Sequence, residues 1–141
     1  MVPRTLNDWT FEAVRDLCAA GQSESDLHDF KFNLAELKNA TKICCAFANT
    51  FGGFIIVGVR DAGQRQFEIV GLNPDKELYG NFVAKVRADP DIAISAPKTI
   101  GVPVSSKLLY VLEVPQSPRR PHLPTAHASS RWLRPGSWYS G

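Results

Sequence analysis

The sequence contains little that would place the protein in a membrane, outside the cell or around a zinc ion. Its longest apolar run is FGGFIIVGV, which is far shorter than the ~20 residues that a transmembrane helix needs. Its three cysteines are odd in number and lack CxxC spacing, so they indicate neither a zinc site nor a disulfide framework. The N-terminal segment, MVPRTLNDW, lacks the apolar core of a signal peptide. We therefore expect a cytoplasmic protein with no membrane partner.

Acidic residues are missing from the last part of the chain. All 14 of them lie at or before Glu113, whereas residues 114–141 contain four arginines and no acidic residue. This asymmetry favours a polyanion-binding edge in the C-terminal segment. The composition, with 44% hydrophobic and 21% charged residues, is otherwise ordinary for a globular protein. We expect one domain over residues 1–141.

Apolar residues at helical spacing predict three helices. The first lies within the N-terminal segment 1–22, where Thr10 is a cap and Gly21 ends the helix. The second begins with a capping box of Asn33 and Glu36 and ends at Gly52-Gly53. Its predicted inner face comprises Leu34, Leu37, Thr41, Cys44, Ala48 and Phe51. The third helix opens at Asn73-Pro74, and its predicted inner face comprises Leu78, Phe82 and Val86.

Apolar runs rich in β-branched residues predict the strands. Residues 54–59, FIIVGV, are typical of a central buried strand, and Asp61-Ala62-Gly63 predicts a turn into an antiparallel return over 67–70. A second pair is predicted from the alternation of Ile100, Val102 and Val104, a turn at Ser105-Ser106, and the strand LLYVLEV at 108–114.

The Pro- and Arg-rich segment 115–141 begins with PQSPRRPHLP, which predicts irregular structure, and residues 131–134 are a candidate edge strand. The order of elements predicts an α+β fold, in which helices pack on a mostly antiparallel sheet.

The segment SESDLHDFK, residues 23–31, gathers the carboxylates of Glu24, Asp26 and Asp29. Magnesium and manganese favour such hard oxygen ligands and keep several waters, so two or three carboxylates suffice to hold one ion. Acidic residues in a loop are often simply solvated, however. The residues alone leave both interpretations open, and Asp26 is expected to face solvent.

Four landmarks of the sequence resemble the Schlafen AlbA-type domain. They are ESDLHDFK, AFANTFGGFIIVGVRD, the pair GL at 71–72, and VPQSPRRPHLP followed by RWLRPGS, and together they run from about Glu24 to Gly136. The resemblance implies a single lobe of an α+β fold related to Alba nucleic-acid-binding proteins. Some members of the family are regulators or accessory modules. In Schlafen proteins proper, the domain forms a groove that cleaves structured RNA, including transfer RNA, with three metal-binding carboxylates.

Carried across by motif, the catalytic and metal-binding carboxylates fall on Glu24, Asp29 and Asp61. The implied cofactor is Mg²⁺ or Mn²⁺, and Asp29 stands where the family usually has a glutamate. Asp61 has a second interpretation as a turn residue, because Asp-x-Gly is common in turns. No P-loop or GxGxxG pattern accompanies Gly52-Gly53, so no nucleotide cofactor is predicted. Schlafen nucleases pair two lobes around RNA, so for this single lobe we expect a homodimer.

Basic residues supply the candidate contacts to nucleic acid. They are Lys31, Arg119, Arg120, Arg131 and Arg134. Guanidinium groups bind phosphate in a bidentate manner, whereas Lys31 has pairing with Asp29 as its alternative role. Trp132 is expected either to stack on a base or to pack on the sheet.

Five further residues of the family landmarks, two histidines, one asparagine and two glycines, have roles that the sequence suggests. His28 is either a proton carrier beside Asp29 or an incidental loop residue, and His122 is expected to orient its loop. Asn49 is a helix cap or a groove residue, and the glycines at 52 and 53 are expected to be structural.

We therefore expect a nucleic-acid-binding domain that prefers RNA, with metal-dependent endoribonuclease activity on structured RNA such as transfer RNA as its extension. The alternative is a non-catalytic DNA-binding or transcription-regulatory module. A third interpretation is an interaction domain whose acidic loop is vestigial.

Overall fold

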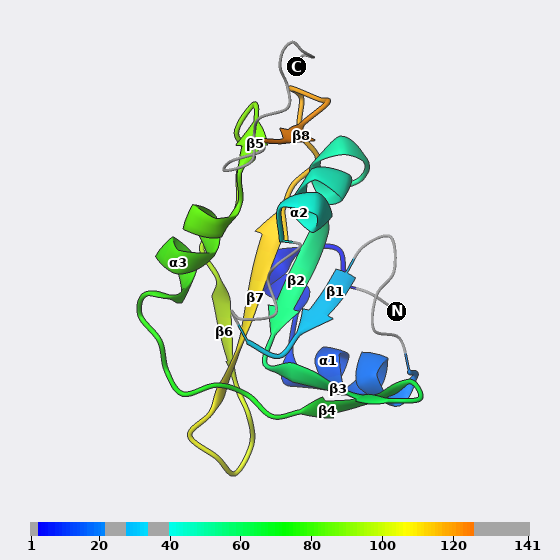
Figure 1. Ribbon diagram of the computed structural model, residues 1–141. Helices are drawn as coiled ribbons and strands as arrows, with labels where there is room; N and C mark the ends of the chain where they lie inside the picture. The colour runs from blue at the N-terminus through cyan, green and yellow to red at the C-terminus, as the bar shows by residue number, and fades with distance from the viewer. Residues whose placement is uncertain (1–2, 22–27, 34–39, 126–141) are drawn as a thin grey trace.

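A four-stranded sheet forms the centre of the molecule, and its strand order is β1-β2-β7-β6 (Figure 1). The computed structural model describes residues 3–21, 28–33 and 40–125. The sheet comprises β1 (His28–Lys31), β2 (Gly53–Val57), β7 (Leu108–Val114) and β6 (Lys98–Gly101). β1 is parallel to β2, and the other neighbours are antiparallel. The predicted α+β fold with a mostly antiparallel sheet is confirmed.

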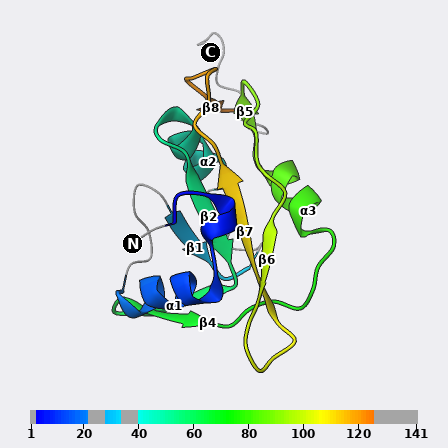
Figure 2. The same cartoon turned by 180° about the vertical axis from the view of Figure 1, so that it is seen from behind.

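Each face of the sheet is covered by its own hydrophobic cluster. On one face lie α2 (Ala40–Asn49) and α3 (Leu78–Lys85), which cover Ile55, Val57 and Leu112. On the other lie the short helix η1 (Leu6–Asp8), α1 (Phe11–Ala19), and a hairpin of β3 (Val59–Gly63) and β4 (Gln66–Ile69) (Figure 2). Trp9 and Phe54 are buried in this second cluster. A small pair of strands, β5 (Ala88–Asp89) and β8 (Leu123–Pro124), completes the described elements.

The predicted helices are present, although two of them differ in extent. Thr10 caps α1 as predicted, since its hydroxyl accepts a hydrogen bond of 3.1 Å from the Ala13 N–H. The capping box of the second helix and its inner residues Leu34 and Leu37 lie outside the described residues. α3 begins at Leu78 rather than at Pro74, because the Asp75 carboxylate accepts from the Glu77 N–H (2.9 Å) and holds a local turn.

Phe51 does not belong to the inner face of the second helix, and that prediction is wrong. The helix ends at Asn49, and Gly52 then adopts a φ of +81° while its N–H donates to Phe47 O (2.8 Å). This glycine termination, which the sequence predicted, turns the chain toward β2. It leaves the Phe51 side chain 75% exposed.

The predicted strand over 54–59 is two strands, because Gly58 redirects the chain between β2 and β3. Its φ is +118°, and a Cβ at this position would lie 2.7 Å from Leu109 Cδ2. Its N–H donates to Lys31 O (2.7 Å). Only glycine adopts this conformation in such a confined space without strain.

The predicted turn at Asp61-Ala62-Gly63 is also wrong in position. These residues belong to β3, and the chain turns at Gln64 and Arg65, which have φ of 53° and 62°. The return strand β4 is antiparallel, as predicted.

The strand predicted from Ile100, Val102 and Val104 is shorter than expected: β6 ends at Gly101, and Val104 lies in the following turn with a φ of 59°. β7 has the predicted bounds, 108–114.

The three cysteines fill the core, as predicted for Cys44 and Cys45. Cys18, Cys44 and Cys45 are all buried as free thiols. Burial raises the pKa of Cys18 to about 11 and that of Cys44 to about 12. These thiols are therefore protonated at neutral pH and unreactive as nucleophiles. No helix among the described residues is long and apolar enough to cross a membrane.

Candidate nucleic-acid interface

The C-terminal end of α2 anchors the stretch of residues 117–122, which we call the arginine segment. The side chain of Asn49 pairs with the backbone of His122 twice: Oδ1 accepts from the His122 N–H (2.7 Å), and Nδ2 donates to the His122 carbonyl (3.0 Å). The Ser117 N–H donates to Ala48 O (2.9 Å). Both ends of the segment are thus fixed to the last turn of one helix. The half-buried Asn49 side chain is thus used to hold His122 rather than to cap its own helix, and its alternative role in a groove stays a prediction.

His122 is the buried centre of the arginine segment and is only 1% exposed. Its Nδ1 lies 2.6 Å from Pro90 O, and its Nε2 lies 2.6 Å from Ser117 Oγ. Because a carbonyl only accepts, Nδ1 donates its proton to Pro90 O, and Nε2 shares a hydrogen bond with the Ser117 hydroxyl. That oxygen in turn accepts from the Arg119 N–H (3.0 Å). The expectation that His122 orients its loop is confirmed.

Arg119 and Arg120 project from the anchored segment and are both exposed. Neither forms an ion pair with any part of the chain that the structure describes. The contacts of Ser117 and His122 hold the backbone on both sides of the two arginines, so the positions of their Cα atoms are constrained. Two exposed guanidinium groups on an anchored segment, with no ion pair among the described residues, are suited to contact the phosphates of a nucleic acid. Arg131, Trp132 and Arg134 lie outside the described residues.

Asp29 and Lys31 lie on the face of β1 that α2 covers. Lys31 Nζ is 3.0 Å from Asp29 Oδ2, and the two side chains are 21% and 7% exposed. Asp29 is opposite Ile55 in the register with β2, and its charge is one cause of the raised pKa of Cys44 on α2. The pairing with Asp29, one of two roles expected for Lys31, is present.

His28 lies on the opposite face of β1 and is fully buried. Its ring centroid is 5.0 Å from that of Phe30 and 6.5 Å from that of Trp9. Neighbouring residues of a strand point to opposite faces, so His28 is directed away from Asp29. Both expectations for this residue, an incidental loop histidine and a proton carrier beside Asp29, are wrong.

Asp61 is exposed on β3 and bonds to its own hairpin. Its Oδ1 accepts from the Gly63 N–H (2.8 Å), which is the local interaction that the Asp-x-Gly pattern predicted, although the turn itself comes later. β3 follows directly from Gly58, whose N–H donates to Lys31 O at the end of β1. Asp29 and Asp61 therefore lie on two strands that meet at Gly58.

The third carboxylate implied by the family, Glu24, lies with Asp26 outside the described residues. Within 3–21, 28–33 and 40–125, no group of three His, Cys, Asp or Glu side chains is arranged to hold a metal ion. The donor chemistry nevertheless suits a hard cation, because Asp29 and Asp61 offer carboxylate oxygens only. A magnesium or manganese site at Glu24, Asp29 and Asp61 thus stays a prediction.

Comparison with known families agrees with the sequence landmarks. A family model described as Schlafen, AlbA_2 matches residues 24–138, which is most of the chain. The chain belongs to the Schlafen AlbA_2 family. Membership of this family indicates a nucleic-acid-binding domain. No curated protein matches the chain.

Sequence reasoning missed the pairing of Asn49 with His122, which are 73 residues apart. A long-range pair of this kind leaves no local pattern. It also missed Arg4 and Phe51, which line a pocket at the start of β2. The glycines after Phe51 were the available signal, because a terminating glycine ends the helix a few residues earlier, here at Asn49, so Phe51 lies beyond it.

Replacement of Asn49 by alanine tests the anchor. The variant leaves the N–H and carbonyl of His122 without their partner, and we expect the free energy of unfolding to fall by about 2 kcal/mol. The measurement is urea denaturation of both proteins. Asn81→Ala, on an exposed position of α3, is the matched control and should stay within about 0.5 kcal/mol of the wild type. Equal stability of Asn49→Ala and Asn81→Ala would contradict the anchoring role.

Proposed function

We propose that this domain binds RNA in preference to DNA, with the arginine segment as its main contact to the phosphate backbone. The observation that carries the proposal is the pair of exposed arginines, Arg119 and Arg120, on a segment held by Asn49, His122 and Ser117. Fixed cations lose less conformational entropy on binding than mobile ones do. The surrounding segment, 114–141, contains no acidic residue that would repel phosphate. Lys31, Arg131 and Arg134 are the further basic residues that we propose as contacts to the nucleic acid.

Helix α2 adjoins both the arginine segment and the Asp29–Lys31 pair. Ala48 and Asn49 hold the arginine segment, while Cys44, one turn earlier on the helix, is close enough to Asp29 for the carboxylate to raise its pKa. Four residues of helix span about 6 Å. The arginine segment and the Asp29–Lys31 pair thus both adjoin α2, and Asp29 is buried beneath the helix.

Charge reversal of the arginines tests the binding surface. Arg119→Glu/Arg120→Glu should weaken binding to all RNA sequences alike, about tenfold or more, and reduce the salt dependence, because two phosphate contacts and their counterion release are lost. Fluorescence anisotropy over a range of salt concentrations, with RNA and DNA of the same sequence, measures both effects. Arg65→Glu/Lys76→Glu, two exposed positions elsewhere, changes the net charge equally and is the control. If both double variants bind alike, the arginine segment is not the interface.

We further propose that the acidic site is catalytic, with Glu24, Asp29 and Asp61 as ligands of Mg²⁺ or Mn²⁺. The Gly58–Lys31 hydrogen bond (2.7 Å) brings the end of β1 close to the start of β3, but Asp29 lies on the face of the sheet that α2 covers and the β3–β4 hairpin lies on the other face. The support for this candidate is therefore the match of the three positions to the family's motif. The bound ion would supply an activated water and neutralise the charge that develops on the phosphate. Lys31 would hold one Asp29 oxygen in place through their ion pair. Structured RNA such as transfer RNA would be the substrate.

Metal addition tests the catalytic proposal in two ways. We expect Mn²⁺ to promote cleavage of transfer RNA and to raise the melting temperature, because an ion that binds only the folded state stabilises it. Glu24→Ala and Asp61→Ala should lose both effects and still bind RNA in a chelator, whereas Asp29→Glu, which restores the usual family residue, should keep or increase cleavage. Asp16→Ala, at an exposed position of α1, is the matched control. RNA that is bound but left intact with either metal would favour the non-catalytic DNA-binding or regulatory module.

We also propose that the protein acts as a homodimer, since one lobe supplies only one wall of a groove that two lobes form in Schlafen nucleases. A symmetric pair places two arginine segments around one nucleic acid. Light scattering over a hundredfold range of protein concentration should show a dimer at the upper end, and addition of RNA should shift the equilibrium toward it. A monomer with full RNA affinity throughout that range would contradict the proposal.

A further inference from the structure

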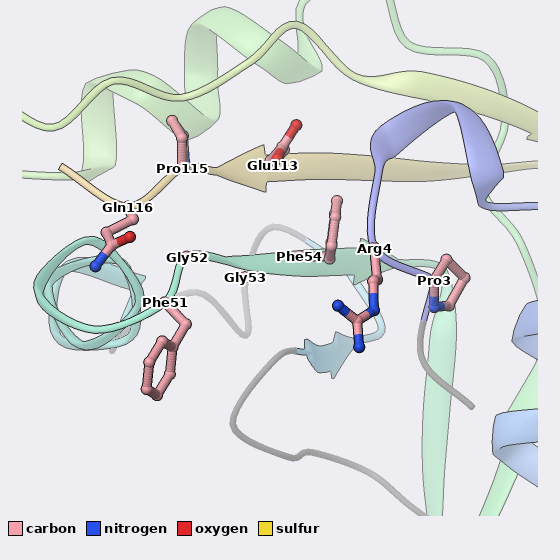
Figure 3. Close-up of a pocket in the computed structure, with 9 residues that line it drawn as sticks. All are labelled: Pro3, Arg4, Phe51, Gly52, Gly53, Phe54, Glu113, Pro115 and Gln116. Carbon is pink, nitrogen blue, oxygen red and sulfur yellow. The ribbon is translucent and has the colours of Figure 1, made fainter.

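Phe51 is the most exposed aromatic residue in the part of the chain that the structure describes, and 75% of its surface is open to solvent. It forms no ring contact with the aromatic residues of the described core. Figure 3 shows its ring pointing away from β2, on the side of the strand opposite to Glu113. Single exposed apolar residues are common on protein surfaces, so the surroundings of this ring decide what it can do.

The backbone is fixed on both sides of Phe51. Before it, the Thr50 N–H donates to Phe47 O (3.2 Å), and the Thr50 hydroxyl donates to Ala46 O (2.7 Å). After it, the Gly52 N–H donates to the same Phe47 oxygen (2.8 Å). A large aromatic side chain with only two torsions, held on a fixed backbone, loses little conformational entropy when a ligand packs on it. The ring is thus suited to act as a platform for a planar group.

The Asn49–His122 pair brings Phe51 close to the arginine segment. The two partners are joined by hydrogen bonds of 2.7 and 3.0 Å. Phe51 lies two residues after Asn49, and Arg120 lies two residues before His122. Two residues of chain span at most about 7 Å. An exposed aromatic ring and an exposed guanidinium group therefore start from the same anchor.

The charges near this anchor suit a nucleic-acid strand. Arg119 and Arg120 are exposed and form no ion pair within the described ranges, and residues 114–141 contain no acidic residue. Proteins that bind single strands combine cations, which contact the phosphates, with aromatic rings on which bases stack. A base inside a continuous duplex is already stacked between its neighbours, whereas an unpaired base has a face available to a protein ring.

We infer that Phe51 stacks on one unpaired base of the RNA whose backbone the arginine segment contacts, an inference that rests on the proposed RNA-binding function. The domain then prefers RNA with an unpaired nucleotide over a continuous duplex. Every base has an aromatic face, so the preference does not depend on which base is unpaired. Contacts of the arginines to phosphates position the RNA but carry no such selectivity. Phe51 thereby makes the domain a reader of bulges, loops and single strands.

A short RNA duplex, either fully paired or with one bulged adenosine, tests the inference. In anisotropy titrations the wild type should bind the bulged duplex about tenfold more tightly, because one base stacks on Phe51. An abasic nucleotide in the bulge keeps the phosphate and the flexibility of the strand but removes the base, so it should abolish the preference. Phe51→Ala should also abolish it without weakening binding of the paired duplex. Phe51→Trp should keep it, and the fluorescence of that variant should be quenched more by the bulged adenosine than by the abasic nucleotide.

Val104→Ala, which truncates another exposed apolar side chain, is the matched control and should keep the preference. Equal binding of the bulged and paired duplexes by the wild type, or a preference that persists in Phe51→Ala, would overturn the inference. If Phe51→Ala lowered the dimer fraction in light scattering and left the preference unchanged, the ring would belong to a contact between copies, and the inference would fall as well. In each of these cases, weak binding by Arg119→Glu/Arg120→Glu would leave the proposed function standing. No binding of any of these RNAs by the wild type would overturn both.

Discussion

Burial of β2 on both faces is the constraint on which the rest of the fold depends. All five of its residues are buried, and its side chains enter the two clusters alternately, Ile55 and Val57 on one face and Phe54 and Ile56 on the other. A strand of this kind needs a neighbour on each edge and a covering layer on each face. β1 and β7 supply the edges, while the α2–α3 and α1–hairpin layers supply the faces. The segments before and after β2 in the sequence thus supply both its neighbouring strands and its covering layers.

Glycines at both ends of β2 determine where the candidate functional residues lie. Gly52 and Gly53 bring the end of α2 against the chain after β7, which leaves Phe51 outside and forms the pocket beside it. Gly58 turns the chain out of the sheet into β3, which carries Asp61 beside β1. The chain emerges from the core at these two points, so exposed functional side chains concentrate there.

The sequence predicted the strongly patterned elements and missed those that depend on distant residues. β7 has the predicted bounds, because its run of seven mostly apolar residues identifies a central strand without reference to any distant residue. The strand at 54–59 was predicted to continue through Gly58. The observed break depends on contacts of Gly58 with the distant residues Leu109 and Lys31, which have no local pattern in the sequence. His28 was assigned to a polar loop from its acidic neighbours, whereas packing against Trp9 and Phe30 decides its burial.

For the candidate sites too, the sequence identified residues but not the contacts that depend on distant parts of the chain. The family landmarks identified Asp29, Asp61 and the two described arginines, but not the contacts that each of them makes. The ion pair of Asp29 with Lys31 follows from alternation on one strand and was among the predicted options. The sequence did not predict that Asn49 holds the arginine segment, because an asparagine near a helix end has several local roles that are indistinguishable in sequence.

The Asp29–Lys31 pair links the two proposed activities through charge. Three carboxylates beside a phosphate backbone would repel it, and the ammonium group of Lys31, 3.0 Å from Asp29 Oδ2, offsets one of those charges. Without a metal, the pair is locally neutral, so the arginine segment is able to dominate the field felt by a phosphate. A divalent cation would add its two positive charges to the same place and strengthen attraction for the backbone. In the proposed site, binding of the metal and binding of the nucleic acid would therefore be cooperative, because each would relieve the electrostatic cost of the other.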